Sequence, residues 1–302
     1  MKAVIVVPTL NAGPLWESWI SSLLATDVDV SNVYVIDSGS ADKTVLQATE
    51  AGFNLESIKK ESFNHGSTRQ NAISNFTDVD FVIYLTQDAV LASSDALHKI
   101  LSPFNDEQVA AVCGRQLPRK SATLIEAHAR IYNYASESFS RSIVDVGKYG
   151  LKTAFISNSF AAYRVSVLRE VGGFPGDVIF GEDMFVATKM LKFGYKIAYA
   201  ADACVYHSHD YSLWQEMKRY FDMGVFHARE PWIRQLLGSA EGEGVKFVVS
   251  EFEYLLKHAF WKVPEEMLRT LLRYVGFRLG LIEDKLPIWL NRRLAMNKIY
   301  FK

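Results

Sequence analysis

A single carboxylate stands at the end of one of the most apolar segments of this chain. Asp88 lies in the segment Thr86-Gln87-Asp88-Ala89, directly after the run 81–85. A carboxylate that leaves a buried strand is costly unless it is solvated or binds a cation. A divalent metal that also contacts phosphate oxygens would satisfy Asp88, since hard oxygen ligands suit Mg2+ or Mn2+. The segment therefore predicts metal-assisted chemistry on a phosphorylated ligand.

Two histidines, His207 and His209, follow a second β-rich stretch at 203–206. In a strand their side chains would point to the same side, because successive side chains alternate between the two faces. Such a pair could bind a metal or a phosphate, and one histidine would be sufficient. A purely structural role is the alternative, and the residues alone leave both open.

Two acids, Glu182 and Asp183, stand directly after Gly181 and before an apolar helical stretch. The helix dipole stabilises acids in a first turn, and this explanation stays open for Glu182. Asp183 is the better candidate for a general base, because a carboxylate held at a helix start keeps a defined direction. The segment thus predicts a group that takes a proton from a hydroxyl.

Two further polar segments could hold a nucleotide. Asp37 ends an apolar run and could accept a hydrogen bond from a base or a ribose hydroxyl, while Asp42 caps the helix that follows. Residues 64–71 open a helix with small side chains and place Arg69 one turn inside. Exposed amides and a guanidinium suit a diphosphate. A plain turn and a capped helix with a surface arginine are the alternatives.

The elements that position these groups alternate along the first half of the chain. Apolar and β-branched runs predict strands at 4–7, 33–36, 57–60, 81–85 and 109–114, with helices at 15–24, 44–50, from 66 and at 94–101. Continuously apolar strands separated by helices indicate an α/β fold with a mainly parallel, Rossmann-like sheet that helices cover on both faces.

Ligands bind beyond the carboxyl ends of the strands in such sheets. The polar segments 8–11, 37–40 and 86–89 fall at three of these ends. No G-x-G-x-x-G follows the first strand and no G-x-x-x-x-G-K-[ST] occurs, which argues against dinucleotide dehydrogenases and nucleotide triphosphatases. A polar ligand across this edge is therefore the expectation.

The second half of the chain has a different pattern. Residues 151–210 predict shorter strands around the helix at Gly181, and from about Tyr211 the pattern is helical to the end. Pro231, Pro264 and Pro287 are expected helix starts or breaks. We therefore expect a first domain at 1–230 and a helical C-terminal region at 231–302.

Composition narrows the function classes. The net charge of -1 over 302 residues argues against nucleic acid as a partner. The two cysteines, Cys113 and Cys204, follow no metal or redox spacing and are expected to be free thiols. No apolar run is long enough to span a membrane. The expectation is a cytoplasmic protein.

Taken in order, these segments resemble family-2 glycosyltransferases of the GT-A fold, most of all bacterial rhamnosyltransferases of O-antigen and other polysaccharide assembly. The resemblance covers roughly residues 1–230. It rests on the order and spacing of VVPTLN (6–11), IDSGSADKT (36–44), NHGSTRQNA (64–72), LTQDA (85–89), GGF (172–174), GEDMF (181–185) and HSH (207–209).

The resemblance implies a role for each matching residue. The nucleoside would be held by Pro8, Thr9, Asp37 and Ser38, and Arg69 would approach the diphosphate or base. Gln87 and Asp88 would line the donor site, with His207 or His209 completing the metal or diphosphate site. Asp183 would be the catalytic base, and Glu182 an acceptor-side or helix-start acid. The family commonly shows D-x-D, and here Thr86 replaces the first aspartate.

The implied reaction is inverting sugar transfer with Mg2+ or Mn2+, using L-rhamnose from dTDP-β-L-rhamnose as the expected donor sugar. The acceptor would be a saccharide, free or carried on a polyprenyl diphosphate. A UDP-hexose donor, an inactive nucleotide-sugar-binding protein and a nucleotidyltransferase are the alternatives. The last would be expected to show a glycine-rich basic loop after the first strand, which PTLNAGP does not provide.

The C-terminal helices leave two explanations open. From Lys257 to Lys302, basic residues outnumber acids and alternate with aromatic residues such as Trp261 and Trp289. Such a surface suits peripheral contact with the inner face of the cell membrane. Packing on the main domain or dimerisation would equally explain it.

Overall fold

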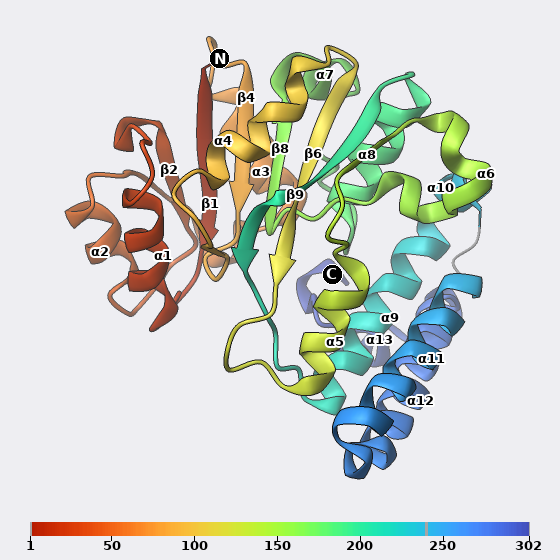
Figure 1. The fold of residues 1–302 in the computed structure, drawn as a ribbon. Coiled ribbons are helices and arrows are strands. Elements are labelled where there is room, and N and C mark those ends of the chain that lie inside the picture. The colour runs from red at the N-terminus through yellow and green to blue at the C-terminus, as the bar shows by residue number, and fades with distance from the viewer. Residues whose placement is uncertain (1, 239–240, 302) are drawn as a thin grey trace.

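The computed structural model describes residues 2–238 and 241–301, and one curved sheet dominates it (Figure 1). Within these residues the sheet has nine strands in the order β3-β2-β1-β4-β8-β6-β9-β5, with β7 paired to β9. The strands are β1 Ala3–Thr9, β2 Val33–Asp37, β3 Asn54–Ser57, β4 Phe81–Leu85, β5 Val90–Leu91, β6 Val109–Leu117, β7 Phe139–Arg141, β8 Phe160–Arg164 and β9 Lys196–Tyr206.

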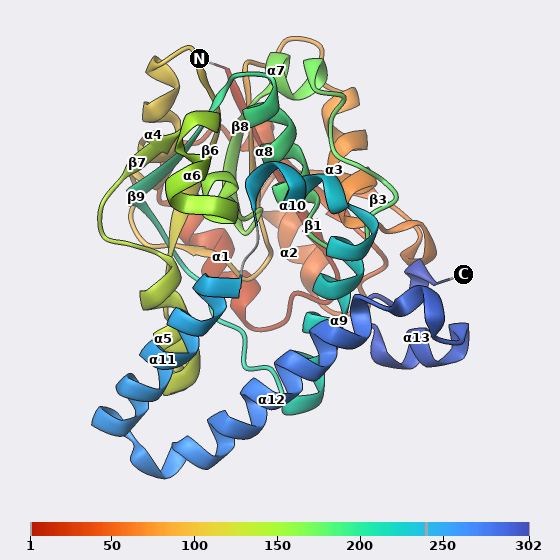
Figure 2. The same ribbon diagram turned by 90° about the vertical axis from the view of Figure 1, so that its right-hand side faces the viewer.

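Helices cover both faces of this sheet, as predicted for an α/β fold (Figures 1 and 2). Those of the α/β part are α1 Leu15–Leu24, α2 Thr44–Glu50, α3 His65–Ser74, α4 Ala96–Leu101, α5 Leu124–Asn133, α6 Val146–Tyr149, α7 Val165–Glu170 and α8 Glu182–Lys192. The C-terminal helices are α9 Leu213–Arg229, α10 Pro231–Leu237, α11 Glu241–His258, α12 Val263–Gly280 and α13 Ile288–Leu294.

The prediction of parallel pairing is confirmed for the first strands of the sheet. β1 pairs in parallel with β2 and β4, and β2 with β3, so their carboxyl ends meet at one edge. β8 lies in the region 151–210, where shorter strands were expected, and it runs antiparallel to both β4 and β6. β6 and β9 are again parallel to each other. The mainly parallel sheet therefore contains one reversed central strand.

The strand expected at 57–60 was placed too late. The structure has β3 at Asn54–Ser57, followed by a 3-10 turn at Lys60–Ser62. All four residues of β3 are exposed, because it is the edge strand of the sheet. An edge strand needs no continuous apolar run, so hydrophobicity did not locate it.

Two apolar clusters lie on the two faces of the sheet. Along β1, Val4 and Val6 belong to one cluster, whereas Ile5 and Val7 belong to the other. Alternate side chains of a strand point to opposite faces, so a strand buried on both sides is apolar throughout. This packing fixes β1, and with it the polar residues at its carboxyl end.

The C-terminal helices pack against the α/β part through α9. α12 lies along α9 at close range, where an added Cβ on Gly276 would come within 2.3 Å of the Met217 carbonyl oxygen. Pro231 begins α10, Pro264 lies in the first turn of α12, and Pro287 precedes α13, as expected. The boundary between 230 and 231 stays a prediction. In the described part of the chain, every helix is too short or too polar to cross a bilayer.

Candidate active site

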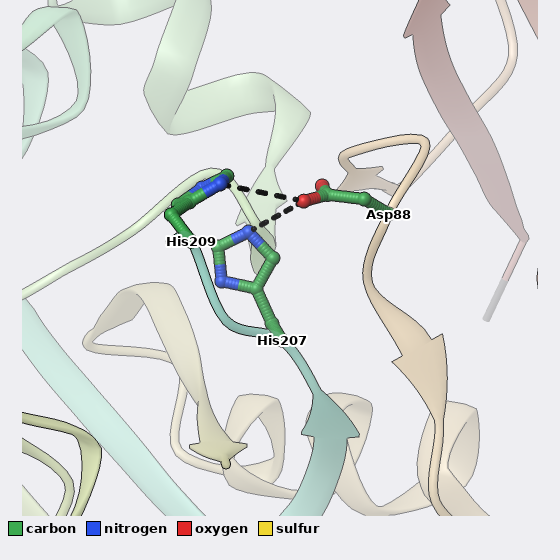
Figure 3. A group of neighbouring side chains, drawn as sticks. All are labelled: Asp88, His207 and His209. Carbon is green, nitrogen blue, oxygen red and sulfur yellow. Dashed lines mark ion pairs between the residues drawn. The ribbon is translucent and has the colours of Figure 1, made fainter. Parts of the chain in front are cut away.

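Strand pairing brings Asp88 to the two histidines (Figure 3). Asp88 lies in the loop between β4 and β5, and the β5–β9 ladder pairs Val90 with Tyr206, the residue before His207. The Asp88 carboxylate oxygen Oδ2 is 3.4 Å from His207 Nε2 and 3.7 Å from His209 Nδ1. Candidate ligand atoms of all three residues lie within 4.8 Å of one another. One carboxylate and two imidazoles at this spacing could hold a divalent metal.

A hydrogen bond from one ring nitrogen of His207 leaves its other ring nitrogen available to a ligand. The Gln116 amide oxygen accepts a hydrogen bond from His207 Nδ1 at 2.8 Å, which leaves Nε2 as the unprotonated nitrogen. Nε2 is buried and has no hydrogen-bond partner among the described residues. A metal-binding histidine usually has its other nitrogen held in this way. Gln116, on β6, had not been predicted, because a glutamine inside a strand has no distinctive sequence pattern.

Electrostatics favour the protonation states that bind metal. Burial lowers the pKa of His207, and burial together with the charge of His207 lowers the pKa of His209 to about 3. Burial opposes ionisation of Asp88, but its close contacts with His207 and His209, together with Thr86, hold the pKa of Asp88 below its usual range. Neutral imidazoles and an ionised carboxylate are the ligand forms.

Three arginines that no sequence motif had indicated surround this cluster. Arg119 donates to both the carbonyl and the carboxylate of Asp88, and Arg130 Nε donates to the His207 carbonyl at 2.9 Å. Arg219 of α9 adds to the lowered pKa of His209 through its charge. Its guanidinium lies 5.1 Å from the Phe180 ring and 5.7 Å from the Tyr211 ring, with no carboxylate partner in the described chain.

The residues expected to hold the nucleoside form one hydrogen-bonded edge. Thr9 and Ser38 are buried, and Pro8 precedes them at the end of β1. The Ser38 hydroxyl donates to the Thr9 carbonyl at 2.9 Å. Gln87 is bonded to Leu10 twice, accepting from its N–H at 2.8 Å and donating to its carbonyl at 3.2 Å. This pair of bonds ties the loop of Asp88 to the end of β1.

Asp37 organises this edge from inside. Its carboxylate accepts from the Thr9 hydroxyl at 3.0 Å, from the Ser40 hydroxyl, and from the N–H groups of Gly39 and Ser40. These four bonds use the acceptor capacity of the carboxylate. A direct bond to a base or ribose would therefore replace one of them, and this role of Asp37 stays a prediction.

Arg69 is placed differently from the expectation of an arginine open to a diphosphate. Its side chain is 4% exposed, and its Nη1 forms a 2.9 Å ion pair with Glu182. Glu182 also accepts from the Asn158 side chain at 3.0 Å. Burial opposes the charge of Glu182, but Arg69, His65 and Asn158 together lower its pKa. Arg69 thus fixes the start of α8, and its contact with a diphosphate stays a prediction.

Asp183 comes next, in the first turn of α8. Gly181 adopts a φ of +70° before this turn, a conformation that a side chain would strain. Asp183 is partly buried and accepts from the N–H groups of Met184 at 2.8 Å and Asn158 at 3.2 Å. Burial, reinforced by the adjacent Glu182, raises the pKa of Asp183 to about 6. A held carboxylate with this pKa has the properties of a general base.

Comparison with known proteins places this site in a family. Residues 2–221 match the family described as "Glycosyltransferase like family 2". The chain is 46% identical over 302 residues to the O-antigen chain rhamnosyltransferase RfbN of Salmonella typhimurium, covering all of this chain and 96% of that one. It is also 46% identical over 298 residues to the O-antigen chain rhamnosyltransferase WbaN of Salmonella anatum, covering 98% and 95%.

Solved structures agree with the fold. A mannosyltransferase of Pyrobaculum calidifontis, in complex with GDP-Man and Mn2+, has a TM-score of 0.65 and 18% identity, with 94% of this chain and 88% of that chain covered. TarS of S. aureus, residues 1–349 with UDP-GlcNAc, has a TM-score of 0.59 and 16% identity, covering 99% and 85%. The expected GT-A fold is confirmed. The chain is a glycosyltransferase and belongs to glycosyltransferase-like family 2.

Proposed function

We propose that this protein transfers L-rhamnose from dTDP-β-L-rhamnose to a saccharide acceptor during synthesis of a bacterial surface polysaccharide. The observation that carries the proposal is the 46% identity to two O-antigen chain rhamnosyltransferases over almost the whole length of all three chains. Transfer with inversion converts the β-linked donor into an α-L-rhamnoside. A UDP-hexose donor is the competing possibility.

In the proposed reaction, Asp183 acts as the general base. It removes the proton from the acceptor hydroxyl, whose oxygen then attacks the anomeric carbon opposite the leaving group. The bond between the anomeric carbon and the diphosphate oxygen breaks, and its electron pair stays on dTDP. The raised pKa of Asp183, about 6, supports this role because the group is ionised at neutral pH yet basic enough to accept a proton.

Negative charge develops on the diphosphate as it leaves. Asp88, His207 and His209 would hold Mg2+ or Mn2+, which supplies Lewis-acid stabilisation of that charge when bound. We assign Arg219 to the same task, because it is near His209 and free of a carboxylate partner in the described chain. The sequence had suggested Arg69 for this contact with the diphosphate, but the Arg69 guanidinium is paired with Glu182.

For the donor, we place the nucleoside against Pro8, Thr9, Asp37 and Ser38, with Gln87 holding the loop that carries Asp88. The hydrogen bonds within this edge support a preformed donor surface. For the acceptor, we propose a saccharide carried on a polyprenyl diphosphate. A peripheral position at the inner face of the cell membrane would suit such an acceptor.

The proposal is tested by calorimetric titration with dTDP and UDP, each with and without Mg2+ or Mn2+. We expect metal-dependent binding that prefers dTDP. Preference for UDP would replace rhamnose by a hexose, and no binding to either nucleotide would overturn the donor site. In the Asp88→Ala variant, metal should no longer strengthen dTDP binding. Unchanged metal dependence would count against Asp88 as a ligand.

A further inference from the structure

Helix α12 buries two of its charged side chains and exposes several of its apolar ones. Glu266 and Arg273 are buried, and Arg273 Nη1 lies 2.9 Å from the Glu266 carboxylate. Met267, Leu271 and Tyr274 are 59%, 56% and 61% exposed. These three residues follow one another at spacings of four and three, so they share a face of the helix. A helix on the surface of a water-soluble protein normally shows the opposite arrangement.

The turn before α12 extends the same apolar surface. Phe260 and Trp261 lie in the 3-10 turn between α11 and α12 and are 67% and 65% exposed. Their rings meet edge to face at 5.4 Å, so they protrude as one aromatic pair. We call this the arm surface, and its residues are Leu256, Phe260, Trp261, Met267, Leu271 and Tyr274. More than half of the exposed large apolar side chains in the described chain come after residue 244.

Most of the charges that border the arm surface are basic, although Glu253 on α11 is an exposed acid one turn before Leu256. Lys257 and His258 close α11 just before the aromatic pair, and the Arg278 guanidinium lies 6.0 Å from the Tyr274 ring. Of the two acids in the first turn of α12, Glu266 is buried and Glu265 is bonded to Lys262 and Arg269. An apolar, aromatic surface with a basic border complements the headgroup layer of an anionic bilayer.

The arm formed by α11, α12 and the turn between them projects away from the sheet in both views, with that turn at its far end (Figures 1 and 2). It extends from the end of the molecule toward which β4, β6 and β9 run, and Asp88 and His207 follow β4 and β9 at that end. A membrane contact there leaves the active-site edge turned toward the bilayer.

We propose that the arm surface docks on a membrane that contains anionic lipid. A second copy of the chain fits less well, because a two-fold interface would bring the same basic borders together. The inference rests on the peripheral membrane position in the proposed function, for which it names the docking surface, and it does not depend on which sugar is transferred.

The test is flotation of the full-length protein with vesicles of phosphatidylcholine, alone or mixed with phosphatidylglycerol. We expect binding to the anionic vesicles that weakens as ionic strength rises, and at least about tenfold weaker binding of a Trp261→Ser/Leu271→Ser/Tyr274→Ser variant. The matched control Leu46→Ser/Val144→Ser/Phe193→Ser removes exposed apolar side chains elsewhere and should bind like the wild type.

Three outcomes would overturn the proposal: no binding of the wild type to anionic vesicles, equal binding of the triple variant, or equal losses in the control. Sedimentation velocity adds a fourth, since a dimer that the triple variant dissociates, without vesicle binding, would identify a self-association surface. Should the triple variant misfold, Trp261→Ser alone gives the same test from a turn. Nucleotide titration of every variant separates failed docking from a failed donor site.

Discussion

Replacing Asp183 by asparagine separates a catalytic role from a structural one. Asparagine keeps the shape of the side chain and can still accept from the N–H groups of Met184 and Asn158. It cannot take up a proton from an acceptor hydroxyl. We therefore expect transfer to fall by about 10²- to 10⁴-fold, the usual contribution of a general base. Nucleotide binding should stay near that of the wild type.

The same substitution should stabilise the fold at high pH. The folded protein raises the pKa of Asp183 from 3.8 to about 6, so its charged form is less stable when folded. Asp183 therefore contributes stability that is fully present below pH 3.8 and lost as the pH rises through about 6. This difference corresponds to about 3 kcal/mol at most at pH 8. Asparagine does not ionise, so the unfolding free energy of Asp183→Asn should exceed that of the wild type at pH 8. This difference should vanish near pH 4.

Two measurements check these expectations together. Urea unfolding of the wild type and Asp183→Asn at pH 4 and pH 8 gives the change in unfolding free energy. The kcat/KM of the wild type for the donor should fall as the pH drops below about 6, because the base becomes protonated. A variant that is less stable at pH 8 and also inactive would indicate a structural role. A variant that keeps more than about a tenth of the activity would refute the general-base assignment.

The remaining predictions concern the groups around these carboxylates. Gln116→Leu should weaken Mn2+ binding by about 10- to 100-fold in calorimetry, because His207 loses its orienting bond; unchanged affinity would exclude that role. Arg219→Met should lower kcat/KM for the donor by about 10²-fold, with partial recovery in Arg219→Lys, and wild-type kinetics would remove Arg219 from the mechanism. Arg69→Met should cost about 3–5 kcal/mol of unfolding free energy by leaving Glu182 unpaired, and Arg69→Met/Glu182→Leu should recover most of it; additive losses would contradict the buried pair.

Much of the fold follows from hydrophobic pattern. The continuously apolar strands β1, β2 and β4 were located within one or two residues, because a strand buried on both faces tolerates few polar side chains. The exposed edge strand β3 was placed too late, since its four residues carry no such pattern. For β8, the pattern predicted only shorter strands somewhere in 151–210, and its antiparallel direction depends on contacts distant in sequence.

The candidate site was predictable where chemistry leaves a local signal. Asp88, Asp183 and the two histidines stand at the ends or starts of regular elements, and the structure brings Asp88 and both histidines together. Arg69 shows the limit of this reasoning, because the buried partner that claims it, Glu182, lies 113 residues further along the chain. A sequence pattern gives the type of a side chain and its element. The partner across the fold decides whether the charge is free for a ligand.

The surroundings of Asp88 and Asp183 shift the pKa values of these two carboxyls in opposite directions. Burial raises the pKa of both carboxyls, but the histidines hold the pKa of Asp88 below its usual range, whereas burial reinforced by neighbouring Glu182 raises the pKa of Asp183 to about 6. A permanently charged carboxylate suits a cation, and a weakly acidic one suits proton transfer. Glu182 can exert this effect because Arg69 keeps it ionised in the interior. The buried pair is therefore more than a structural anchor: removing both charges should lower the pKa of Asp183 and move the acid limb of kcat/KM to lower pH. An unmoved limb in a folded Arg69→Met/Glu182→Leu variant would show that burial alone sets the base.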